Sequence, residues 1–492
     1  MLDMPDLNSG GILEYRDTLE SSPPRPVVDE GCSAPSEGGD RLKDTPVRDV
    51  AIVGGGILGM TLALRLQNEG IRVTLIEAAP VTGGLTQSQT IGGFTWDRFY
   101  HVILRSDLHL QALLQELGLT HLLRWATTRT GFYIEGDLHS LSDTMDFVRF
   151  PPLSASDKIR LAATILYASR IRNWQRLERI SVTDWLCRLS GERTFKRVWL
   201  PLLRSKLGEN YRQTSAAFIW AIIARMYAAR RSGLKREMFG YVQGGYSTIL
   251  QAFRTRLERL RVRTLAGRPV TGVGNLADRV EVRLAGGGTY CFDRVVLTVP
   301  CGQVLALCPE LSDPERERLT SVVYQGIVCA SLLLRKPLAD FYITNITDSR
   351  VPFTGVIEMS ALVDPAVFGG NALVYLPRYL TQSDPIWQKT DADIRETFVA
   401  ALERMYPGFD RRDVLAFQVA RVREMLAVST LHYSERSRPP LRTSLPNVFV
   451  VNSAQIANGT LNVNETVALA NSSAEELRHL FAEAAGSPVR RP

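Results

Sequence analysis

The stretch DVAIVGGGILGMTLALRLQNEGIRVTLIE, residues 49–77, decides the fold of this 492-residue chain. Residues 50–53 form an uninterrupted apolar run, which is typical of a strand buried in a parallel sheet. Three glycines follow at once, and a helical pattern over residues 57–69 ends at Gly70 before a second strand-like run, RVTLIE. This order of strand, glycines, helix and strand predicts a βαβ unit that binds a dinucleotide.

Each glycine of this unit has a separate task. Gly54 permits the tight turn, Gly56 lets the backbone approach a pyrophosphate, and Gly59 lets the helix pack on the strand. The helix begins with Ile57 and Leu58, and its first N–H groups and positive dipole end point at the phosphates. We therefore expect the pyrophosphate to lie at this helix N-terminus.

A carboxylate and a second glycine pair decide which dinucleotide is bound. Glu77 lies 18 residues after Gly59, where it can accept hydrogen bonds from ribose hydroxyls, and an acid there disfavours the 2′-phosphate of NADP. The segment AAPVTGGLTQS follows, and its Gly-Gly pair resembles the second glycine motif of the flavin amine oxidase superfamily, whose loop contacts FAD. That family usually has Arg after the pair, where this chain has Leu. Unless the pair is an ordinary turn, the resemblance assigns FAD contacts to Ala78, Gly83, Gly84, Leu85 and Thr86.

The resemblance extends over most of residues 47–480. The segments GYVQGGYSTILQAF (240–253), GRPVTGV (267–273) and DRVVLTVP (293–300) are similar to later parts of the family's nucleotide domain, and Val270 takes the place of a backbone contact to the flavin nucleotide. Residues 447–477 sit where the family has a strand, a glycine-bearing turn and a final helix against the flavin. In this turn only Gly459 remains of the family's glycines. We expect Asn464 to cap the helix, and the polar residues predicted to contact the cofactor here are Asn452, Asn462 and Asn464, beside Thr460.

Strands suited to one sheet therefore occur at the start, middle and end of the chain. The predicted fold class is α/β: a Rossmann-type FAD/NAD(P)-binding domain, glutathione-reductase-like, over residues 46–95, 238–305 and 440–485. An inserted α+β, helix-rich substrate domain is expected over 96–237 and 306–439, with a disordered leader over 1–45 and a tail over 486–492. Helices are predicted over 108–117, 155–174, 181–189, 193–200, 214–230, 391–405 and 464–484, and a hairpin around 135–137.

Net charge, apolar runs and cysteine spacing limit the kinds of ligand and cellular location that are expected. The net charge of +7 suggests acidic ligands or a membrane surface and argues against a dedicated nucleic-acid binder. The basic stretch RMYAARRSGLKR (225–236) is a candidate for contact with anionic lipid headgroups or an anionic substrate, or else a solvated face. No apolar run is long enough to span a membrane. The six cysteines form neither a C-x-x-C pair nor a His/Cys cluster, which predicts reduced thiols, no metal site and a cytoplasmic protein; a peripheral position at the inner face of the membrane is the alternative.

Candidate catalytic residues lie in the segments WDRFYH (96–101) and PLLRSKLG (201–208). The chain is similar to bacterial protoporphyrinogen oxidase-like and phytoene desaturase-like oxidoreductases, and locally to UDP-galactopyranose mutases, in which a His by the flavin corresponds to His101. His101, flanked by Arg98, is the predicted acid–base group, and the resemblance lets Lys206 hold a water beside the flavin. The alternatives are a packing segment and a helix-end cation. Four aromatic residues line either a substrate tunnel or a core: Trp185, Trp199, Trp220 and Tyr227.

Three functions follow from these features. The first is an FAD-dependent oxidoreductase that takes a hydride from a C–N or C–C bond of a small organic molecule and is reoxidised by O2 or a quinone. The second is a flavin-dependent isomerase of a nucleotide sugar, for which the mutase's C-terminal arginine pattern is missing. The third is a non-catalytic binding protein on the same fold, like the Rab GDP-dissociation inhibitors. The substrate and the oligomeric state are not written in the sequence.

Overall fold

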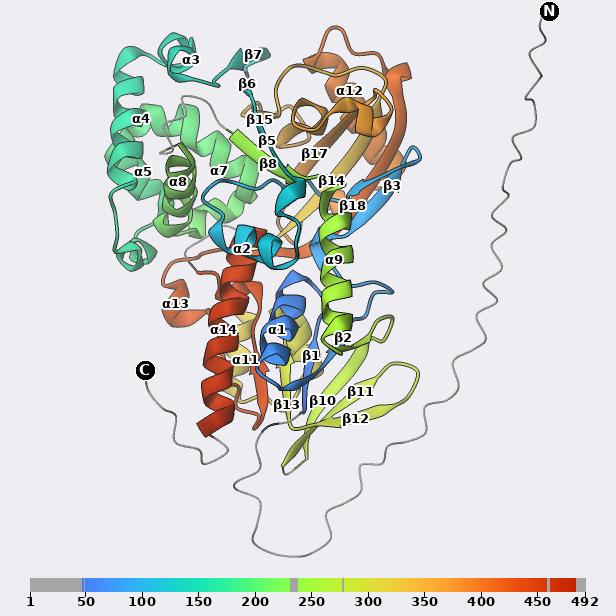
Figure 1. Ribbon diagram of the computed structural model, residues 1–492. Helices are drawn as coiled ribbons and strands as arrows, with labels where there is room; N and C mark the ends of the chain where they lie inside the picture. The colour runs from blue at the N-terminus through green and yellow to red at the C-terminus, as the bar shows by residue number, and fades with distance from the viewer. Residues whose placement is uncertain (1–46, 48, 231–237, 277, 458–460, 484–492) are drawn as a thin grey trace, which may run out of the picture.

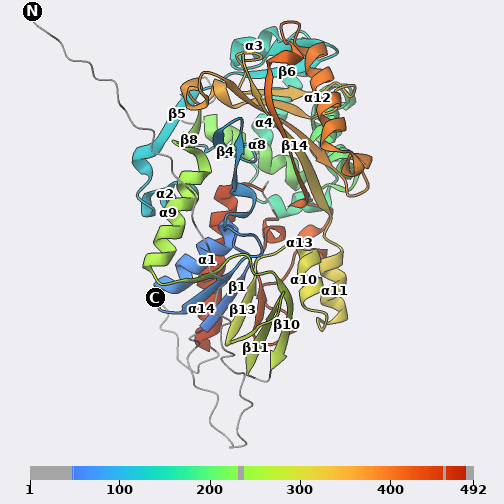
Figure 2. The ribbon, with the colours of Figure 1, turned by 90° about the vertical axis from the view of Figure 1, so that its right-hand side faces the viewer.

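The computed structural model describes residues 47, 49–230, 238–276, 278–457 and 461–483. The predicted leader, the residues Gly459 and Thr460, the tail and much of the basic stretch 225–236 lie outside these ranges. The described chain forms a nucleotide-binding region, at the bottom of Figure 1, and a second region above it that joins a large sheet to a lobe of helices (Figures 1 and 2).

The nucleotide-binding region is built on a five-stranded parallel sheet. Its strand order is β19-β13-β1-β2-β9, so strands from the beginning, middle and end of the chain pair directly. The apolar runs seen in the sequence put both faces of β1 and β2 in the core. This arrangement confirms the predicted α/β class. The strands are β1 (Asp49–Val53), β2 (Arg72–Ile76), β9 (Arg263–Leu265), β13 (Arg294–Leu297) and β19 (Val448–Val450).

Different elements cover the two faces of this sheet. One face packs against three helices: α1 (Ile57–Asn68), α9 (Gly245–Arg259) and α14 (Val463–Glu483). The other face packs against a three-stranded antiparallel sheet and two helices: β10 (Val270–Leu276), β11 (Arg279–Leu284), β12 (Thr289–Phe292), α10 (Cys301–Leu307) and α11 (Asp313–Thr320). Helix α2 (Leu108–Glu116) also lies against α14, and its Leu113 joins the core between the sheet and these three helices.

The second region contains a seven-stranded sheet of order β18-β14-β17-β16-β15-β6-β7. Its pairs are antiparallel except β15 with β6. All eleven residues of its long strand β14 (Tyr324–Leu334) are buried, and α12 (Asp391–Met405) covers one face, with the bounds expected from the sequence. The predicted hairpin is confirmed as β6 and β7. The remaining strands are β6 (Thr130–Ile134), β7 (Asp137–Ser140), β15 (Ile343–Ile346), β16 (Gly355–Glu358), β17 (Ala372–Leu380) and β18 (Val414–Ala427).

The helical lobe differs from its prediction in two places. The predicted helix 155–174 ends at Ala168, and the predicted helix 193–200 is a short helix followed by a π-helical turn, Phe195–Trp199. Pro201 explains the second difference, because it lacks the N–H of a regular α-helical bond, and the chain passes through the π-helical turn into α7 without leaving the helical conformation. The helices are α3 (Thr144–Arg149), α4 (Ala155–Ala168), α5 (Val182–Ser190), α6 (Glu192–Thr194), α7 (Leu200–Leu207) and α8 (Ala216–Arg230).

Two two-stranded ribbons and the short helix α13 (Tyr433–Arg436) complete the fold. One ribbon pairs β3 (Ser88–Ile91) with β4 (Phe94–Asp97), and the other pairs β5 (Leu123–Thr127) with β8 (Met238–Val242). Cys291 is disulfide-bonded, so the expectation of reduced cysteines is wrong at this position. Within the described ranges no helix could cross a membrane and no cluster of side chains could hold a metal ion.

Candidate functional site: a dinucleotide cradle beside a buried Asp–His pair

The first glycine motif leaves no room for side chains. A Cβ on Gly59 would lie 1.9 Å from the Gly54 carbonyl oxygen, and one on Gly54 would lie 2.4 Å from Thr298 Oγ1. Gly56, which precedes α1, has no side chain to cap the helix, and the first turn holds no acidic residue. The N–H groups at Ile57 and Leu58 are therefore set up to bind a phosphate.

The second glycine motif packs on the first, backbone to backbone. Gly83 N donates to Gly55 O at 2.8 Å, and Gly56 and Gly83 form an isolated parallel bridge. A Cβ on Gly84 would lie 3.1 Å from Gly56 Cα. The two glycine loops thus lie side by side, so the backbone N–H groups of both can face one pyrophosphate. Thr86 closes the loop by donating its hydroxyl to Gly83 O, while Leu85 is half-buried against the large sheet.

Glu77 holds the turn of the first motif in place. Its Oε2 accepts from Gly55 N at 2.6 Å and its Oε1 accepts from Ala79 N at 2.7 Å. The carboxylate stays half-exposed, with lone pairs left over for ribose hydroxyls. Ala78 is exposed beside it, and Val270 begins β10 on the far side of the sheet.

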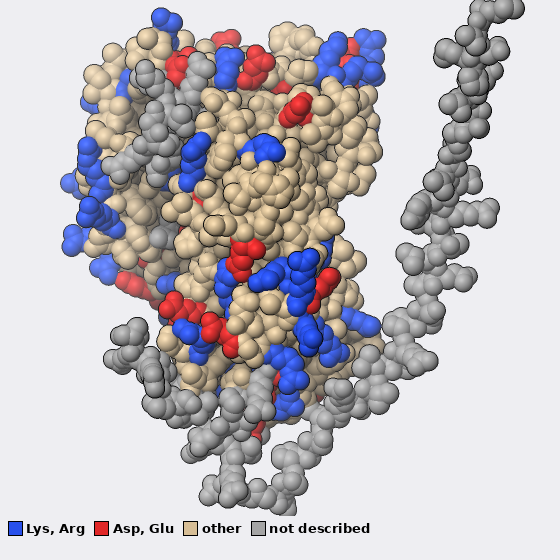
Figure 3. Space-filling model, viewed as in Figure 1, with Lys and Arg blue, Asp and Glu red and all other residues tan. Residues whose placement is uncertain are grey.

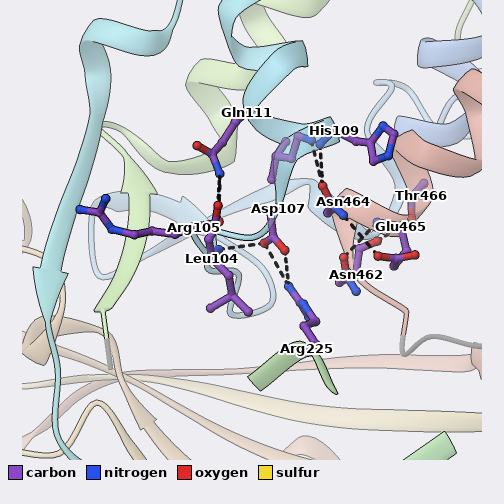
Figure 4. Close-up of polar contacts among 11 residues, drawn as sticks. Leu104, Arg105, Asp107, His109, Gln111, Arg225, Asn462, Asn464, Glu465 and Thr466 are labelled. Carbon is purple, nitrogen blue, oxygen red and sulfur yellow. Dashed lines mark hydrogen bonds and ion pairs between the residues drawn. The ribbon is translucent and has the colours of Figure 1, made fainter. Parts of the chain in front are cut away.

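The two asparagines at the start of α14 have other roles than predicted. Asn462, not Asn464, caps α14, because its Oδ1 accepts from Glu465 N at 3.0 Å. Asn464 instead accepts from His109 N and Leu110 N, at 2.9 and 3.1 Å, and so ties α14 to the first turn of α2 (Figure 4). The expectation for Asn464 was wrong because a residue two positions earlier already occupies the cap.

A buried ion pair lies next to this junction. Arg225 of α8 donates to both carboxylate oxygens of Asp107 at 3.0 Å, and Asp107 is 2% exposed (Figure 4).

Asn452, the third predicted asparagine, is also buried. It donates to Val299 O at 3.0 Å and accepts from Ala454 N, so its side chain joins the ends of β13 and β19. A contact of Asn452 with the cofactor stays a prediction.

The β3–β4 ribbon brings the predicted acid–base segment back to the second glycine loop. Arg98 N donates to Gln87 O at 3.0 Å, one residue beyond Thr86. His101 follows, and its ring packs at a tilt of 48° against Tyr246, the second residue of α9, with 4.7 Å between centroids. His101 therefore lies three residues after a backbone hydrogen bond to the end of the second glycine loop, and its contact with the cofactor stays a prediction.

Asp97 is the partner of His101 that the sequence analysis missed. Its Oδ2 lies 4.0 Å from His101 Nδ1, and its Oδ1 accepts from Tyr246 N at 2.7 Å. Burial raises the pKa of Asp97 to about 7, against the opposing hydrogen bond from Tyr246 N, and burial lowers the pKa of His101 to about 4. The spacing of four residues between Asp97 and His101 is the sequence signal that could have found the pair.

Several buried polar atoms around this pair have no hydrogen-bond partner among the described residues. They include His101 Nδ1 and the hydroxyls of Tyr246 and Tyr342, and Thr82 Oγ1 beside the glycine loops. Buried polar groups are normally satisfied, so their gathering here fits a site that completes its hydrogen bonds with bound groups. The residues present thus fit a dinucleotide that carries a polar ring.

Lys206, on α7 of the helical lobe, reaches the segment that carries His101 through two tyrosines. Its Nζ donates to Tyr379 Oη at 3.0 Å, and Tyr379 Oη lies 2.6 Å from Tyr100 Oη. Burial and the neighbouring Tyr379 raise the pKa of Tyr100 well above its usual value. The chain Lys206–Tyr379–Tyr100 ends one residue from His101.

Trp185 and Trp199 are buried in the core of the helical lobe, and Trp220 packs against it, so for these three residues the core alternative is confirmed. Tyr227 is half-buried on α8.

Residues 59–476 match the family described as flavin containing amine oxidoreductase. The chain belongs to this family. Its cofactor is therefore FAD, and the chain is an oxidoreductase, which favours the two enzymatic hypotheses over the non-catalytic one. The glycine cradle and the strands from three parts of the chain are the family's FAD-binding fold.

Two named relatives show low sequence identity to this chain. It is 24% identical over 342 residues to coproporphyrinogen III oxidase of Bacillus subtilis, covering 62% of this chain and 72% of that protein. For the oxidase of the same name from Mycobacterium leprae the values are 26% over 289 residues, covering 54% of this chain and 62% of the relative. A solved structure of reduced UDP-galactopyranose mutase shares the fold, with a TM-score of 0.68, 15% identity, and coverage of 90% of this chain and 98% of the mutase.

Proposed function

We propose that this chain oxidises a C–N or C–C bond of a small organic substrate, with His101 as the group that accepts the proton. The observation that carries the proposal is the β3–β4 ribbon, in which Asp97, the partner of His101, lies opposite Ser88, two residues beyond Thr86 of the second glycine loop. Relatives named as coproporphyrinogen III oxidases support the direction of the reaction. FAD, when bound, supplies the acceptor for the hydride.

The protonation states of the pair suit this role. Because burial lowers the pKa of His101 to about 4, its imidazole is neutral at neutral pH and can accept a proton. Asp97, with a pKa near 7, keeps part of its proton at the same pH, and because its Oδ2 lies 4.0 Å from His101 Nδ1, a proton can pass between them through one bridging water. The pair can therefore take up a proton from substrate without burying a net charge beforehand.

Lys206, Tyr379 and Tyr100 provide a second polar path into the site. The lysine is half-buried and directs its ammonium group at the tyrosine pair, so it can donate a proton toward the cofactor side or fix the orientation of Tyr100. Arg98 is half-buried beside the pair and is proposed to bind an anionic part of the substrate. Reoxidation by O2 or a quinone, in a cytoplasmic or membrane-peripheral setting, completes the proposal.

The test is anaerobic reduction of the flavin by candidate substrates, porphyrinogens and amines among them. We expect His101→Gln to retain FAD and to reduce it roughly 10²- to 10⁴-fold more slowly, which is the range for loss of a general base. The matched control is His139→Gln, because His139 packs on Phe150 at the edge of the helical lobe. Equal rates for His101→Gln and wild type would contradict the proposal. Turnover that requires reduced flavin and consumes no electrons would replace it with the isomerase.

A further inference from the structure

The outer face of α4 is apolar although it faces solvent. Ile159, Leu166 and Tyr167 are 71%, 42% and 54% exposed, and Ala162 and Ala163 between them are exposed too. Their positions, i, i+3, i+4, i+7 and i+8, form one stripe along the helix. The opposite face already packs into the lobe through Leu161 and Ala168. Helix α4 thus has a second apolar face that no described residue covers.

Helix α3 extends this stripe. Met145 and Val148 are 54% and 60% exposed. Lys158 Nζ of α4 donates to Val148 O at 2.6 Å, which fixes α3 against the start of α4. The two helices lie together at the outer edge of the helical lobe (Figure 1). We call the exposed apolar residues of both helices the α3–α4 surface: Met145, Val148, Ile159, Ala162, Ala163, Leu166 and Tyr167.

Within residues 144–180 the exposed charges have one sign. Every exposed charged residue of the segment 144–180 is an arginine: Arg149, Arg160, Arg170, Arg172, Arg176 and Arg179. Its three acidic residues are half-buried or buried; Asp157, for example, is 3% exposed and accepts from Ser154 and Thr194. Of the six arginines only Arg179 forms an ion pair with a described residue, Glu435.

Further basic residues lie at the N-terminal half of α4. Arg193 reaches Asp157 of α4 at 3.7 Å, and with Lys196, Arg197 and Glu192 it lines a shallow hollow on α6 and the π-helical turn. Lys and Arg gather accordingly along the left-hand edge of the molecule, over the helical lobe (Figure 3). The apolar stripe is thus flanked mainly by cations, and the one exposed anion named here, Glu192, pairs with Lys196 at 2.6 Å.

We infer that the α3–α4 surface docks on a membrane that contains anionic phospholipids. A helix with an apolar stripe flanked by arginines lies in the membrane interface, its stripe among the acyl chains and its cations at the phosphates. At 14 residues, α4 is about 21 Å long, too short to cross a bilayer. A second copy of this chain fits less well, because a symmetric contact would oppose the same arginines to one another.

The test uses the full-length FAD-loaded protein and two kinds of vesicle, phosphatidylcholine alone and phosphatidylcholine mixed with phosphatidylglycerol. We expect the protein to co-sediment with the mixed vesicles and to be released by salt. Ile159→Ser with Leu166→Gln should weaken this binding roughly a hundredfold, since two aliphatic side chains leave the acyl region. The matched control is Leu276→Ser on β10, whose side chain is also exposed, at 43%.

The folded state of each variant is checked by its FAD content and melting temperature, which these exposed substitutions should leave unchanged. The inference is overturned if wild type stays in solution with both vesicles, or if the Ile159/Leu166 variant binds as well as wild type. It is also overturned if sedimentation velocity shows a wild-type dimer that the same variant dissociates, because a second copy then covers the surface.

Discussion

Asp97→Asn and His101→Gln should change the pH dependence of stability in opposite directions. The side chain of Asp97 is 3% exposed, and its hydrogen bond from Tyr246 N can be accepted equally by an amide oxygen. Asp97→Asn therefore removes the titration and little else. Burial raises the pKa of Asp97 from 3.8 to about 7 and lowers that of His101 from 6.5 to about 4.

The sign of each effect follows from where the protons are bound. For Asp97 the folded pKa is the higher one, so the folded state binds more protons between about pH 4 and 7, and stability falls as the pH rises through this window. For His101 the folded pKa is the lower one, so stability rises between about pH 4 and 6.5. Each slope is about 1.4 kcal/mol per pH unit. In the wild type the two slopes cancel, because the pair holds one proton throughout the shared window.

The assay is calorimetric melting of each variant against wild type across this window. A change of about 1.4 kcal/mol per pH unit corresponds to roughly 1.5 °C in Tm for a chain of this size. Relative to wild type, Asp97→Asn should gain this amount per pH unit as the pH rises, and His101→Gln should lose it. The double variant should run parallel to wild type. Single variants that also run parallel to wild type would refute the assignment of a shared, buried proton.

Three further predictions concern the cradle and the junction beside it. Gly59→Ala puts a methyl group against Gly54 O, so the protein should purify without FAD; normal flavin absorbance would contradict the cradle. Asn464→Ala removes two hydrogen bonds to the first turn of α2 and should cost about 1–2 kcal/mol of stability, measured by chemical denaturation, with an unchanged midpoint as the opposing result. Arg225→Met leaves the Asp107 carboxylate buried without its partner and should cost about 3–5 kcal/mol; adding Asp107→Asn should restore most of the loss, and failure to do so would show that packing, not charge, holds α8 there.

Local sequence was sufficient to predict the nucleotide-binding unit. The βαβ order, the bounds of α12 and the hairpin at 130–140 depend on neighbouring residues, whose spacing is visible in the chain. The irregular helical turn before Pro201 was also visible in principle, because proline removes a backbone donor. Its position was missed because the apolar periodicity continues across the π-helical turn.

The environment of His101 could not be predicted in the same way. The Asp97 carboxyl becomes important because Tyr246, 149 positions later, donates its backbone N–H to it and packs its ring against His101. Helix capping by Asn462 rather than Asn464 depends on where α14 begins, a matter of two residues that periodicity does not resolve. The positive charge around the α3–α4 surface was not predicted either, because the sequence does not show that the acidic residues of this segment are buried or half-buried.

The pairing of β1 with β13 and of β13 with β19 has a consequence for the order of events during synthesis. Val53 pairs with Leu297, and Leu297 pairs with Val450, so the sheet is completed only when nearly the whole chain has left the ribosome. The first βαβ unit emerges early but must wait for strands about 240 and 400 residues downstream, and such long loops close slowly. FAD, which needs both glycine loops on a finished sheet, should therefore bind after translation and act as the ligand that draws the late-forming sheet to completion. A chain stopped before β19 would hold every glycine of the cradle and still have no finished sheet on which to keep the cofactor.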